Sequence, residues 1–529
     1  MSQLLTDEIG QAFEITQENE TRIRGKACLS TNIAIVKDIA DFISTSFGPT
    51  GMDKILQSKD DDISISNDGA TILKEMDMSE NPISQLIVQL SKAQDDEVGD
   101  GTTGVVILTS ALLQQANQLL SKGVHPVRIT EGFERALKLS IEHLEKIADN
   151  IEDKEKAMVD AAKTSLNSKI VSKAMEKFAR ICVDAVMSVA DVEREDVDFD
   201  LVKILHSTGK DVSETELING LVIKKEFSHP QMKKEVKDAK VALLACPFEP
   251  PKLKNKHSLI IKNAEEYREL QSYERETFVN MIKALKDVGA DLVLCQWGFD
   301  DEANSLLMEN SLPAVRWVGG NDLGLISKHI GGNIISRFED LKPEDLGRAS
   351  VSEVSLGTEN EKMLMIENSS QKKSVSILVR GANDIVIEEA KRSIQDAMSA
   401  VRNVLINKKV VYGGGSAELS TSIFLEEKSK EYEGDQEECV LAFSRALEDI
   451  PLILARNSGF DAMDYLTSLR KSQVESDCPY LGVDCFENDQ SNMKILNVFD
   501  TFSTKVKQLQ MATELACSIL KISDVIVPN

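Results

Sequence analysis

The sequence predicts a multi-domain protein whose two ends are mainly helical and whose middle third is an α/β domain. A chain of 529 residues is long for one hydrophobic core, because single cores rarely grow beyond about 250 residues. Apolar residues recur at helical spacing near both ends, over residues 22–47 and 503–520. In the middle third, short apolar runs such as 241–245 alternate with helical stretches such as 264–288, a pattern typical of α/β domains.

The composition is that of an acidic, soluble globular protein. Hydrophobic residues make up 42% of the chain and charged residues 28%, and 87 acidic against 61 basic side chains give a net charge of −26. Nucleic acids and anionic membranes carry negative charge, so this balance argues against either of them as the main partner.

The cysteines, the histidines and the first residues indicate a cytoplasmic protein. Eight cysteines are scattered without a C-x-x-C pair, and several lie in apolar runs, so we expect buried free thiols in a reducing compartment. The six histidines lie apart from one another and from the cysteines, a pattern that predicts no zinc site. Residues 1–21 lack the basic and apolar segments of a signal peptide, and no apolar run approaches bilayer length.

Helical patterns dominate the N-terminal part of the chain, and we assign their apolar faces to the core. These helices are expected over residues 22–47, 104–120, 127–151 and 175–190. A turn containing Gly48 and Gly51 ends the first helix, and a hairpin-like segment at 54–66 follows it. Asp68 then lies in a glycine turn directly before another expected helix.

The stretch 94–103 is the main candidate for a ligand site. It is acidic, then glycine-rich, then hydroxylated, and it opens onto the helix expected at 104–120. Unpaired N–H groups and the positive end of the helix dipole gather at such a terminus, so a phosphate would be stabilised there. The run from Gly99 to Gly104 fits G-x-G-x-x-G, but residues 91–97 are polar where a dinucleotide fold needs a buried strand. We reject the dinucleotide interpretation and keep a simple helix cap as the alternative.

Within this stretch the residue types suit a phosphate and a metal ion. Gly99 and Gly101 let the backbone approach a ligand closely, and Thr102 and Thr103 add hydroxyl donors. Asp100 offers an oxygen ligand for a hard cation such as magnesium. A carboxylate beside a phosphate would repel it unless a metal ion lay between them.

The middle third contains the pattern of a projecting arm. Its strands are expected at 221–223, 241–245 and 291–295, and its helices near 264–288 and 299–311. A proline-rich and then basic segment at 247–257 resembles the root of an arm, which the amphipathic helix over 265–285 would extend. A solvated excursion on the surface is the alternative.

The last part returns to long helices. Its expected elements are a strand at 375–379, helices at 385–406 and 503–520, and a strand at 524–527. Asp396 lies within the first of these helices, and the three consecutive glycines 413–415 open the helical end of the chain. Taken singly, Asp396 facing water, a solvated Lys169 and a flexible glycine turn are the ordinary interpretations.

Taken together, these motifs resemble the group II chaperonins, the ATP-driven folding machines of the archaeal and eukaryotic cytosol. The motifs that carry the resemblance are residues 46–51, 67–71 and 99–103, Asp396 in its helix, and residues 413–415. They occur in order, at the family's spacing, over nearly the whole chain. A finer likeness, to one type of subunit within that family, is carried by residues 227–232, 246–251, 295–304 and 481–485.

The resemblance implies the chaperonin fold, with a mainly helical equatorial domain, an α/β intermediate domain and an α/β apical domain with a helical protrusion. The expected boundaries are 1–149 and 408–529 for the equatorial domain, 150–217 and 372–407 for the intermediate domain, and 218–371 for the apical domain. The protrusion, which forms the built-in lid in this family, is expected at about 247–285.

The resemblance also implies the residues of an ATP site. Asp68 and Asp396 match the two carboxylates that position and activate the attacking water, and Asp100 matches the magnesium ligand. The expected nucleotide-binding residues are Gly48, Gly51, Gly101, Thr102, Thr103, Ser168, Lys169, Gly413, Gly414, Gly482 and Asp500, of which Lys169, with Ser168, matches the γ-phosphate sensor. ATP and Mg²⁺ are the expected cofactors, with K⁺ as a further candidate cation.

Three positions depart from the family pattern without removing a phosphate or metal ligand. Gln395 stands where relatives usually carry histidine, Arg456 replaces a usual glutamate, and Phe47 replaces a common leucine. We have no physical account of Arg456.

The expected function is that of an ATP-hydrolysing subunit in a cytoplasmic double-ring chaperonin, with lid closure coupled to hydrolysis. Related chaperonin subunits would complete a hetero-oligomeric ring. The clients would be non-native proteins, such as actin and tubulin in this family. No nucleic acid or membrane is expected as a partner. One alternative is a structural ring subunit that binds ATP without hydrolysing it. Another is a small-molecule kinase, for which the chain lacks G-x-x-x-x-G-K-[ST].

Overall fold

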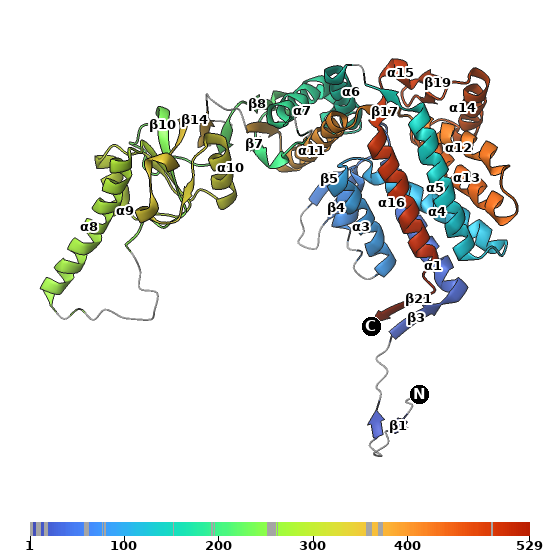
Figure 1. Ribbon diagram of the computed structural model, residues 1–529, viewed down its shortest axis with the longest axis horizontal. Helices are drawn as coiled ribbons and strands as arrows, with labels where there is room; N and C mark the ends of the chain where they lie inside the picture. The colour runs from blue at the N-terminus through green and yellow to red at the C-terminus, as the bar shows by residue number, and fades with distance from the viewer. Residues whose placement is uncertain are drawn as a thin grey trace. The chain divides into compact units, whose positions relative to one another are not determined.

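The chain divides into two compact units, Met1–Val183 with Glu388–Asn529 and Asp184–Ile387 (Figure 1). The computed structural model describes residues 4–6, 12–14, 20–57, 63–76, 78, 81–151, 153–191, 194, 196–250, 261, 263–355, 362–368, 374–487 and 490–528. The first unit is therefore assembled from both ends of the chain, and the second is the uninterrupted middle.

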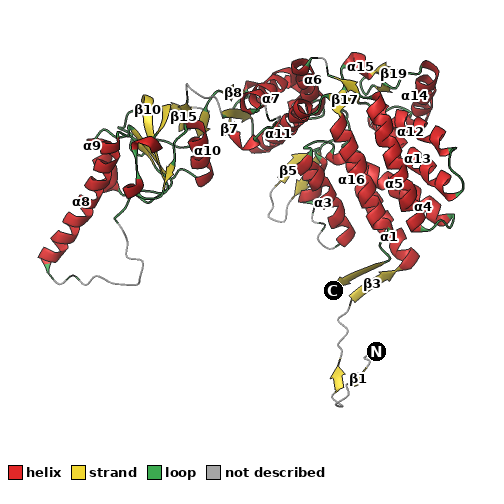
Figure 2. Cartoon of the chain, in the orientation of Figure 1, coloured by secondary structure: helices red, strands yellow, loops and turns green. Residues whose placement is uncertain are grey.

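The first unit is built mainly of helices, drawn red in Figure 2. Its helices are α1 (Gly25–Ser44), α2 (Gly69–Glu75), α3 (Pro82–Glu97), α4 (Thr102–Ser121), α5 (Pro126–Ile147), α6 (Lys154–Leu166), α12 (Ser416–Ser429), α13 (Asp435–Asn457), α14 (Ala462–Ser476), α15 (Met493–Leu496) and α16 (Phe502–Leu520). Two more helices, α7 (Met175–Val189) and α11 (Asp384–Ile406), contain the residues at which the two units divide.

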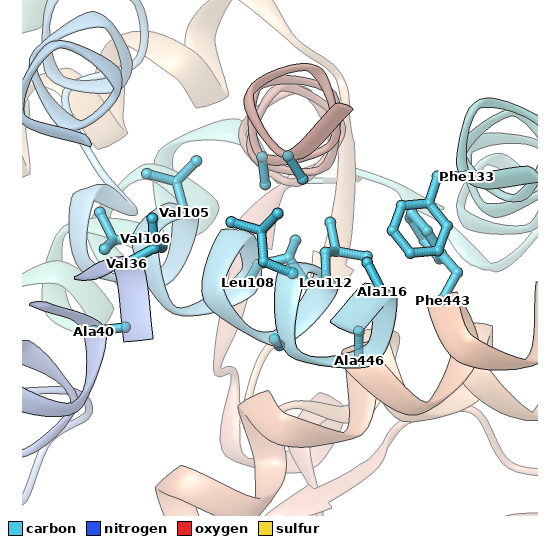
Figure 3. Close-up of a cluster of buried hydrophobic side chains, with 14 of the residues drawn as sticks. Val36, Ala40, Val105, Val106, Leu108, Leu112, Ala116, Phe133, Phe443 and Ala446 are labelled. Carbon is cyan, nitrogen blue, oxygen red and sulfur yellow. The ribbon is translucent and has the colours of Figure 1, made fainter. Parts of the chain in front are cut away.

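Helix α4 is the centre of the first unit because its residues 104–113 are all buried. It packs against α1, α3, α13 and α16, so this part of the helix has no solvent-facing stripe of charged residues. In Figure 3 its Leu108 and Leu112 lie between the side chains of α1 and those of α13. Phe133 of α5 and Phe443 of α13 complete this core with an edge-to-face contact at 5.7 Å between ring centroids. Residues from both chain ends are thus needed to bury one helix.

The strands of the first unit are short and paired in small sheets. The pairs are β1 (Leu4–Thr6) with β2 (Ala12–Glu14), β3 (Glu20–Arg24) with β21 (Asp524–Pro528), β4 (Lys54–Gln57) with β5 (Ile63–Ser66), and β18 (Leu481–Val483) with β19 (Gln490–Asn492). In a three-stranded sheet, β17 (Lys409–Tyr412) lies between β6 (Asp149–Asn150) and β20 (Phe499–Thr501). The β3–β21 pair joins the two ends of the chain, with Val525 opposite Ile23.

The second unit is an α/β domain around one mixed sheet. Its strands are β7 (Val202–Thr208), β8 (Glu216–Ile218), β9 (Leu221–Ile223), β10 (Glu235–Leu244), β11 (Leu292–Cys295), β12 (Ala314–Val315), β13 (Ile334–Ile335), β14 (Gly347–Ser355), β15 (Lys362–Glu367) and β16 (Val375–Gly381). The main sheet has the order β12-β11-β10-β14-β15-β9, with β13 also paired to β10, while β7, β16 and β8 form a second sheet. Its helices are α8 (Ala264–Val288), α9 (Asp301–Glu309) and α10 (Gly320–Ile330).

Most predicted elements are confirmed, and two helix boundaries are wrong because a strand lies there. The helix expected over 127–151 ends at Ile147, since Asp149 and Asn150 form β6 and pair with β17. The helix expected over 22–47 begins only at Gly25, because residues 20–24 form β3 and pair with β21 some 500 residues later. The strand Glu20–Arg24 contains a single apolar residue, Ile23, so no alternation in the sequence distinguishes it from the start of a helix. The expected hairpin at 54–66 is present as β4 and β5, although its tip at 58–62 lies outside the described residues.

The helix of the expected arm is present, but its root is not described. Helix α8 covers the range expected for the arm helix, whereas residues 251–260, most of the proline-rich and basic root, lie outside the described part of the chain. Phe278, Ile282 and Leu285 anchor the C-terminal half of α8 in the core of the second unit, while Tyr267 and Tyr273 in its N-terminal half are exposed.

The cysteines are free thiols, as the scattered pattern predicts. Cys28, Cys182, Cys246, Cys295, Cys439 and Cys517 are buried, and Cys478 and Cys485 are half-buried. Among the described residues, none of the helices combines the length and apolar character that crossing a bilayer requires.

Candidate nucleotide site

A cavity of about 600 Å³ lies in the first unit, where loops from distant parts of the chain meet. The predicted site residues that line it are Gly48, Asp68, Asp100, Gly101, Thr102, Thr103, Ser168, Lys169, Asp396, Gly413, Gly414 and Asp500. The size is in the usual range for a small-ligand site. Two of the predicted residues, Gly51 and Gly482, are not among those that line it.

Both of these glycines lie just behind the lining, where a side chain has no room. A Cβ atom on Gly482 would come within 3.0 Å of the Gly414 carbonyl oxygen and 3.1 Å of the Gly413 one. At Gly51 it would collide with the backbone carbonyl of Ser46. They shape the loops that present Gly48, Gly413 and Gly414 to the cavity, and they are too far back to line it themselves.

The N-terminus of α4 opens into the cavity. Gly101 precedes the helix with φ of 78°, a left-handed conformation that favours glycine. Asp100 Oδ1 accepts the Gly101 N–H at 2.7 Å, and Gln94 Nε2 donates to the Asp100 carbonyl at 2.9 Å, so the loop is held from both sides. The positive end of the 20-residue dipole of α4 therefore faces the cavity, which favours an anion.

The N-terminus of α2 packs against that of α4, and glycine makes this possible. A Cβ atom on Gly69 would lie 2.7 Å from Thr103 Oγ1 and 2.9 Å from the Thr103 backbone. Any larger residue would push the two helix starts apart. The turn of Asp68 is thereby placed directly beside the loop of Asp100.

Asp68 is an ionised, fully engaged carboxylate. Its Oδ2 accepts hydrogen bonds from the Thr71 N–H and hydroxyl, both at 2.9 Å, and its Oδ1 accepts one from the Thr102 hydroxyl at 2.8 Å. Burial alone would raise the pKa of Asp68, but the charge of Lys169 and these hydrogen bonds together hold its pKa below the usual value. Its orientation is fixed by groups on α2 and α4.

Lys169 and Asp396 form a buried ion pair in the same cavity. Lys169 Nζ lies 2.6 Å from Asp396 Oδ2, and the two side chains are only 9% and 20% exposed. Burial raises the pKa of Asp396 to about 8, with Lys169 opposing that rise and Asp68 adding to it. Burial would lower the pKa of Lys169, yet Asp396 and Asp68 raise it overall, so the lysine is charged. One ammonium thus serves two carboxylates.

Asp100 is suited to hold a metal ion whose other ligands are phosphate oxygens and water. Burial, and then the charge of Asp500, raise the pKa of Asp100 to about 6, so the cavity holds more carboxylate than its own cations neutralise. Within the described residues, no three His, Cys, Asp or Glu side chains gather to hold a metal by themselves. Magnesium is commonly bound by one or two carboxylates together with substrate phosphates and water. The donor set present suits that mode.

Two charged residues were not predicted: Lys505, which lines the cavity, and Glu418, which pairs with it. Lys505 Nζ lies 2.7 Å from Glu418 Oε1 and 3.1 Å from Asp500 Oδ2, and it lines the cavity. Burial would lower the pKa of Lys505, but the two carboxylates raise it overall. Lysines and glutamates are rarely buried, and no local spacing marks these two, so the sequence alone offers no signal for them.

Glu389 is a further unpredicted residue, and it connects α11 to the turn of Asp68. It is 2% exposed and lies two helical turns before Asp396. The Ser66 hydroxyl donates to Glu389 and accepts the Asp68 N–H at 3.1 Å. Glu389 also pairs with Arg392 at 3.1 Å. A hydrogen-bonded chain therefore runs from α11 through β5 to the backbone of Asp68.

If the cavity is the ATP site that the sequence predicts, replacing Glu389 with alanine should slow ATP turnover without weakening nucleotide binding. The Ser66 hydroxyl would lose its acceptor, and the turn that holds Asp68 would lose its link to α11. We expect kcat to fall roughly tenfold, because small misplacements of a reacting group are costly, with KM nearly unchanged. Glu389→Gln keeps the acceptor oxygen and should restore most of the rate. Equal losses in both variants, or a change confined to KM, would contradict the positioning role.

Sequence comparison agrees with the fold. Residues 39–529 match the family model of the TCP-1/cpn60 chaperonin family, and the chain belongs to that family. It is 61% identical over 527 residues to the T-complex protein 1 subunit epsilon of Encephalitozoon cuniculi, covering 99% of both chains.

Archaeal relatives are similar over nearly the same length. The chain is 37% identical to thermosome subunit beta of Aeropyrum pernix, over 99% of this chain and 96% of the relative. It is 36% identical to a thermosome subunit of Methanothermococcus thermolithotrophicus, over 98% and 94%. The predicted group II chaperonin resemblance and chaperonin fold are thereby confirmed.

The finer likeness is also confirmed. Residues 227–232, 246–251, 295–304 and 481–485 predict the epsilon subunit of the eukaryotic cytosolic chaperonin CCT, also called TRiC, as the subunit type most similar to this chain. The 61% identity to an epsilon subunit, against 37% and 36% to thermosome subunits, supports this assignment.

Proposed function

We propose that this chain is an ATP-hydrolysing subunit of a cytoplasmic double-ring chaperonin, in which related subunits enclose and fold non-native proteins. The observation that carries the proposal is the cavity in the first unit. It brings together a helix N-terminus, three carboxylates and a buried lysine that come from four separate stretches of the chain. Membership of the TCP-1/cpn60 family supports the same conclusion.

The proposal assigns roles to the parts of the chain. The equatorial, nucleotide-binding domain would comprise 1–149 and 408–529, the hinge-like intermediate domain 150–217 and 372–407, and the client-facing apical domain 218–371 with the lid at about 247–285. Asp396 would then come from the intermediate domain, whereas Asp68 and Asp100 are equatorial. Hydrolysis would therefore depend on the position of the intermediate domain, which couples it to lid movement.

In this site the phosphates would lie at the N-terminus of α4. Gly48 and Gly101 would allow the close approach of the phosphates, and Thr102 and Thr103 would donate to them. Asp100 would hold Mg²⁺, which offsets the negative charge of the phosphates when bound. At the other end, Gly414 and Asp500 would border the adenosine, with Gly482 leaving room behind Gly414 and Lys505 holding the Asp500 carboxylate in place.

The hydrolytic step would use the two remaining carboxylates to place and deprotonate water. Phosphoryl transfer depends chiefly on positioning and charge stabilisation. Asp68, held by three hydrogen bonds, would orient the water. Asp396 in its ionised form would accept the proton, and because burial raises its pKa to about 8 this carboxylate is a stronger base than that of most aspartates. A γ-phosphate beside Lys169 would compete with Asp396 for the ammonium, and the released carboxylate would become available as the base.

The test is to isolate the native complex through a tag on this chain, size it and identify its subunits by mass spectrometry. A ring-sized particle containing other chaperonin chains, which releases phosphate from ATP into water, supports the proposal. A homomeric ring would remove the hetero-oligomeric part, and a small monomer would contradict ring assembly. A ring whose activity is unchanged when the aspartates of this chain are replaced would favour the alternative, a structural subunit that binds ATP without hydrolysing it.

A further inference from the structure

The second unit contains a separate hollow that the nucleotide chemistry does not use. It measures about 700 Å³ and is bordered by Glu249, Trp297, Phe299, Asp300, Arg316 and Trp317, which we call the tryptophan cleft. The chain contains only two tryptophans, and both lie here. Two of the segments that distinguish this subunit type, 246–251 and 295–304, meet at the cleft, although neither has a part in the proposed ATP site.

Both indole rings are held open to solvent by a rigid frame. Trp297 is 48% exposed and Trp317 is 56% exposed, which is unusual for the largest apolar side chains. Trp297 Nε1 donates to the Ala245 carbonyl at 2.8 Å, and the Trp317 N–H donates to the Trp297 carbonyl at 3.3 Å. The neighbouring Val318 N–H donates to the Cys295 carbonyl at 3.0 Å, which ties the loop of Trp317 to the end of β11.

The backbone beneath the cleft is specialised to present Trp317. Trp317 has φ of 58°, a left-handed conformation that is rare for a bulky residue and that clusters at functional sites. Its ring lies directly over Gly298, where an added Cβ would be 2.5 Å from Trp317 Cζ2. Phe299, which lines the cleft, packs edge-to-face against the buried Phe248 with ring centroids 5.7 Å apart. The aromatic surface is therefore preformed.

The charge around the cleft favours a cationic partner. Glu249 and Asp300 line it, and the exposed Asp301 and Glu302 follow Asp300 in the first turn of α9. Arg316 is the one basic residue that borders the cleft among those described. An indole face attracts a guanidinium or ammonium group, and nearby carboxylates strengthen that preference. Apolar occupants would gain nothing from these carboxylates.

We propose that the tryptophan cleft binds an extended basic segment of a non-native protein, with an arginine or lysine side chain stacked on an exposed indole and paired with Asp300. The inference rests on the proposed folding function and deepens it by naming a chemical class of client segment. It predicts that this subunit contributes charge-selective client contacts in addition to general apolar ones.

The test uses the full-length chain without nucleotide and three tryptophan-free peptides of equal length, one arginine-rich, one glutamate-rich and one glutamine-rich. Because every tryptophan of the chain lies at the cleft, its emission reports directly on binding there. We expect a saturable change in emission with the arginine-rich peptide only, and we expect higher salt to weaken it. Equal responses to all three peptides, or a preference for the acidic one, would overturn the proposal.

Separate variants test the contribution of the Trp317 indole and that of the carboxylates to peptide binding. Trp317→Gly suits the positive φ and removes the indole, so it should weaken binding of a labelled arginine-rich peptide roughly tenfold. Asp300→Asn keeps a good residue before α9 and, combined with Glu249→Gln, tests the charges without touching the rings. Asp287→Asn removes an equivalent exposed charge outside the cleft and should bind as wild type. Unchanged binding in both the Trp317 and the charge variants refutes the site.

The outcome is independent of the ATP site. Peptide binding is measured without nucleotide, and Trp317→Gly should leave ATP turnover of the assembled complex at the wild-type rate. A chain that binds the peptide but fails to hydrolyse ATP would contradict the hydrolytic proposal alone. A chain that hydrolyses ATP but shows no preference for the basic peptide would contradict the cleft alone.

Discussion

Replacing Asp396 with asparagine should lower ATP turnover by roughly 100-fold or more while leaving nucleotide affinity near that of the wild type. The amide cannot accept the proton of the attacking water, and a positioned base typically contributes about 10²–10⁴-fold to a rate. The phosphate-binding groups at the start of α4 are untouched by the change. Phosphate release by the purified chain, together with binding of a fluorescent ATP analogue, measures the two effects separately.

Asp384→Asn is the matched control, because Asp384 lies in the same helix but is exposed at its first turn. It should hydrolyse ATP at the wild-type rate. If Asp396→Asn were as active as this control, Asp396 would have no part in the reaction. If instead it lost affinity for ATP along with turnover, its role would be in binding rather than in proton transfer.

Replacing Lys169 with methionine should produce the largest loss of stability in the first unit. The lysine is the cation paired with Asp396 and it also opposes the charge of Asp68, so its removal leaves buried carboxylates uncompensated. Breaking a buried pair from one side costs about 3–5 kcal/mol. The free energy of unfolding in urea, followed by circular dichroism, measures the loss. Lys173→Met, at an exposed position nearby, should change it little.

The Lys169 variant should also depend on pH in a definite direction. The folded-state pKa of Asp396 is already raised to about 8 and rises further without the lysine. An acid whose pKa is raised by folding binds more protons in the folded state, so stability falls as the pH rises towards the folded pKa. The loss in Lys169→Met should therefore be smaller at pH 6 than at pH 8. The double variant Lys169→Met with Asp396→Asn should recover part of it at pH 8, and a purely additive double variant would contradict the pairing.

The fold was largely predictable because its signals are local. The long helices have continuous apolar stripes, as in α5 and α16, and the strands of the second unit are apolar runs of the expected length. The start of α1 was missed because β3 exists only through its pairing with β21, at the opposite end of the chain. A pattern read over about a dozen consecutive residues cannot show that a segment pairs with a strand far away in the sequence.

The candidate site was predictable only where motif and geometry coincide. The loop of Gly101 and the turn of Asp68 could be recognised because each is a glycine-containing turn directly before a predicted helix. Lys169 and Asp396, judged singly, look like solvated surface residues, and it was the family pattern that singled them out. Glu389, Lys505 and the tryptophan cleft were not predicted, because their meaning depends on burial and on neighbours far away in sequence. Their roles remain predictions, as do those of the motif residues.

The first unit is assembled from both ends of the chain, and this has a consequence for how the protein folds during synthesis. A ribosome synthesises the chain from its first residue, so the whole second unit emerges before α12, α13 and α16 exist. Until then α4 has no partner for the faces that these late helices cover, and an apolar helix remains uncovered in the nascent chain. The N-terminal third must wait for the last residues translated, so a chaperonin subunit of this design itself passes through a prolonged unfinished state before its fold can close.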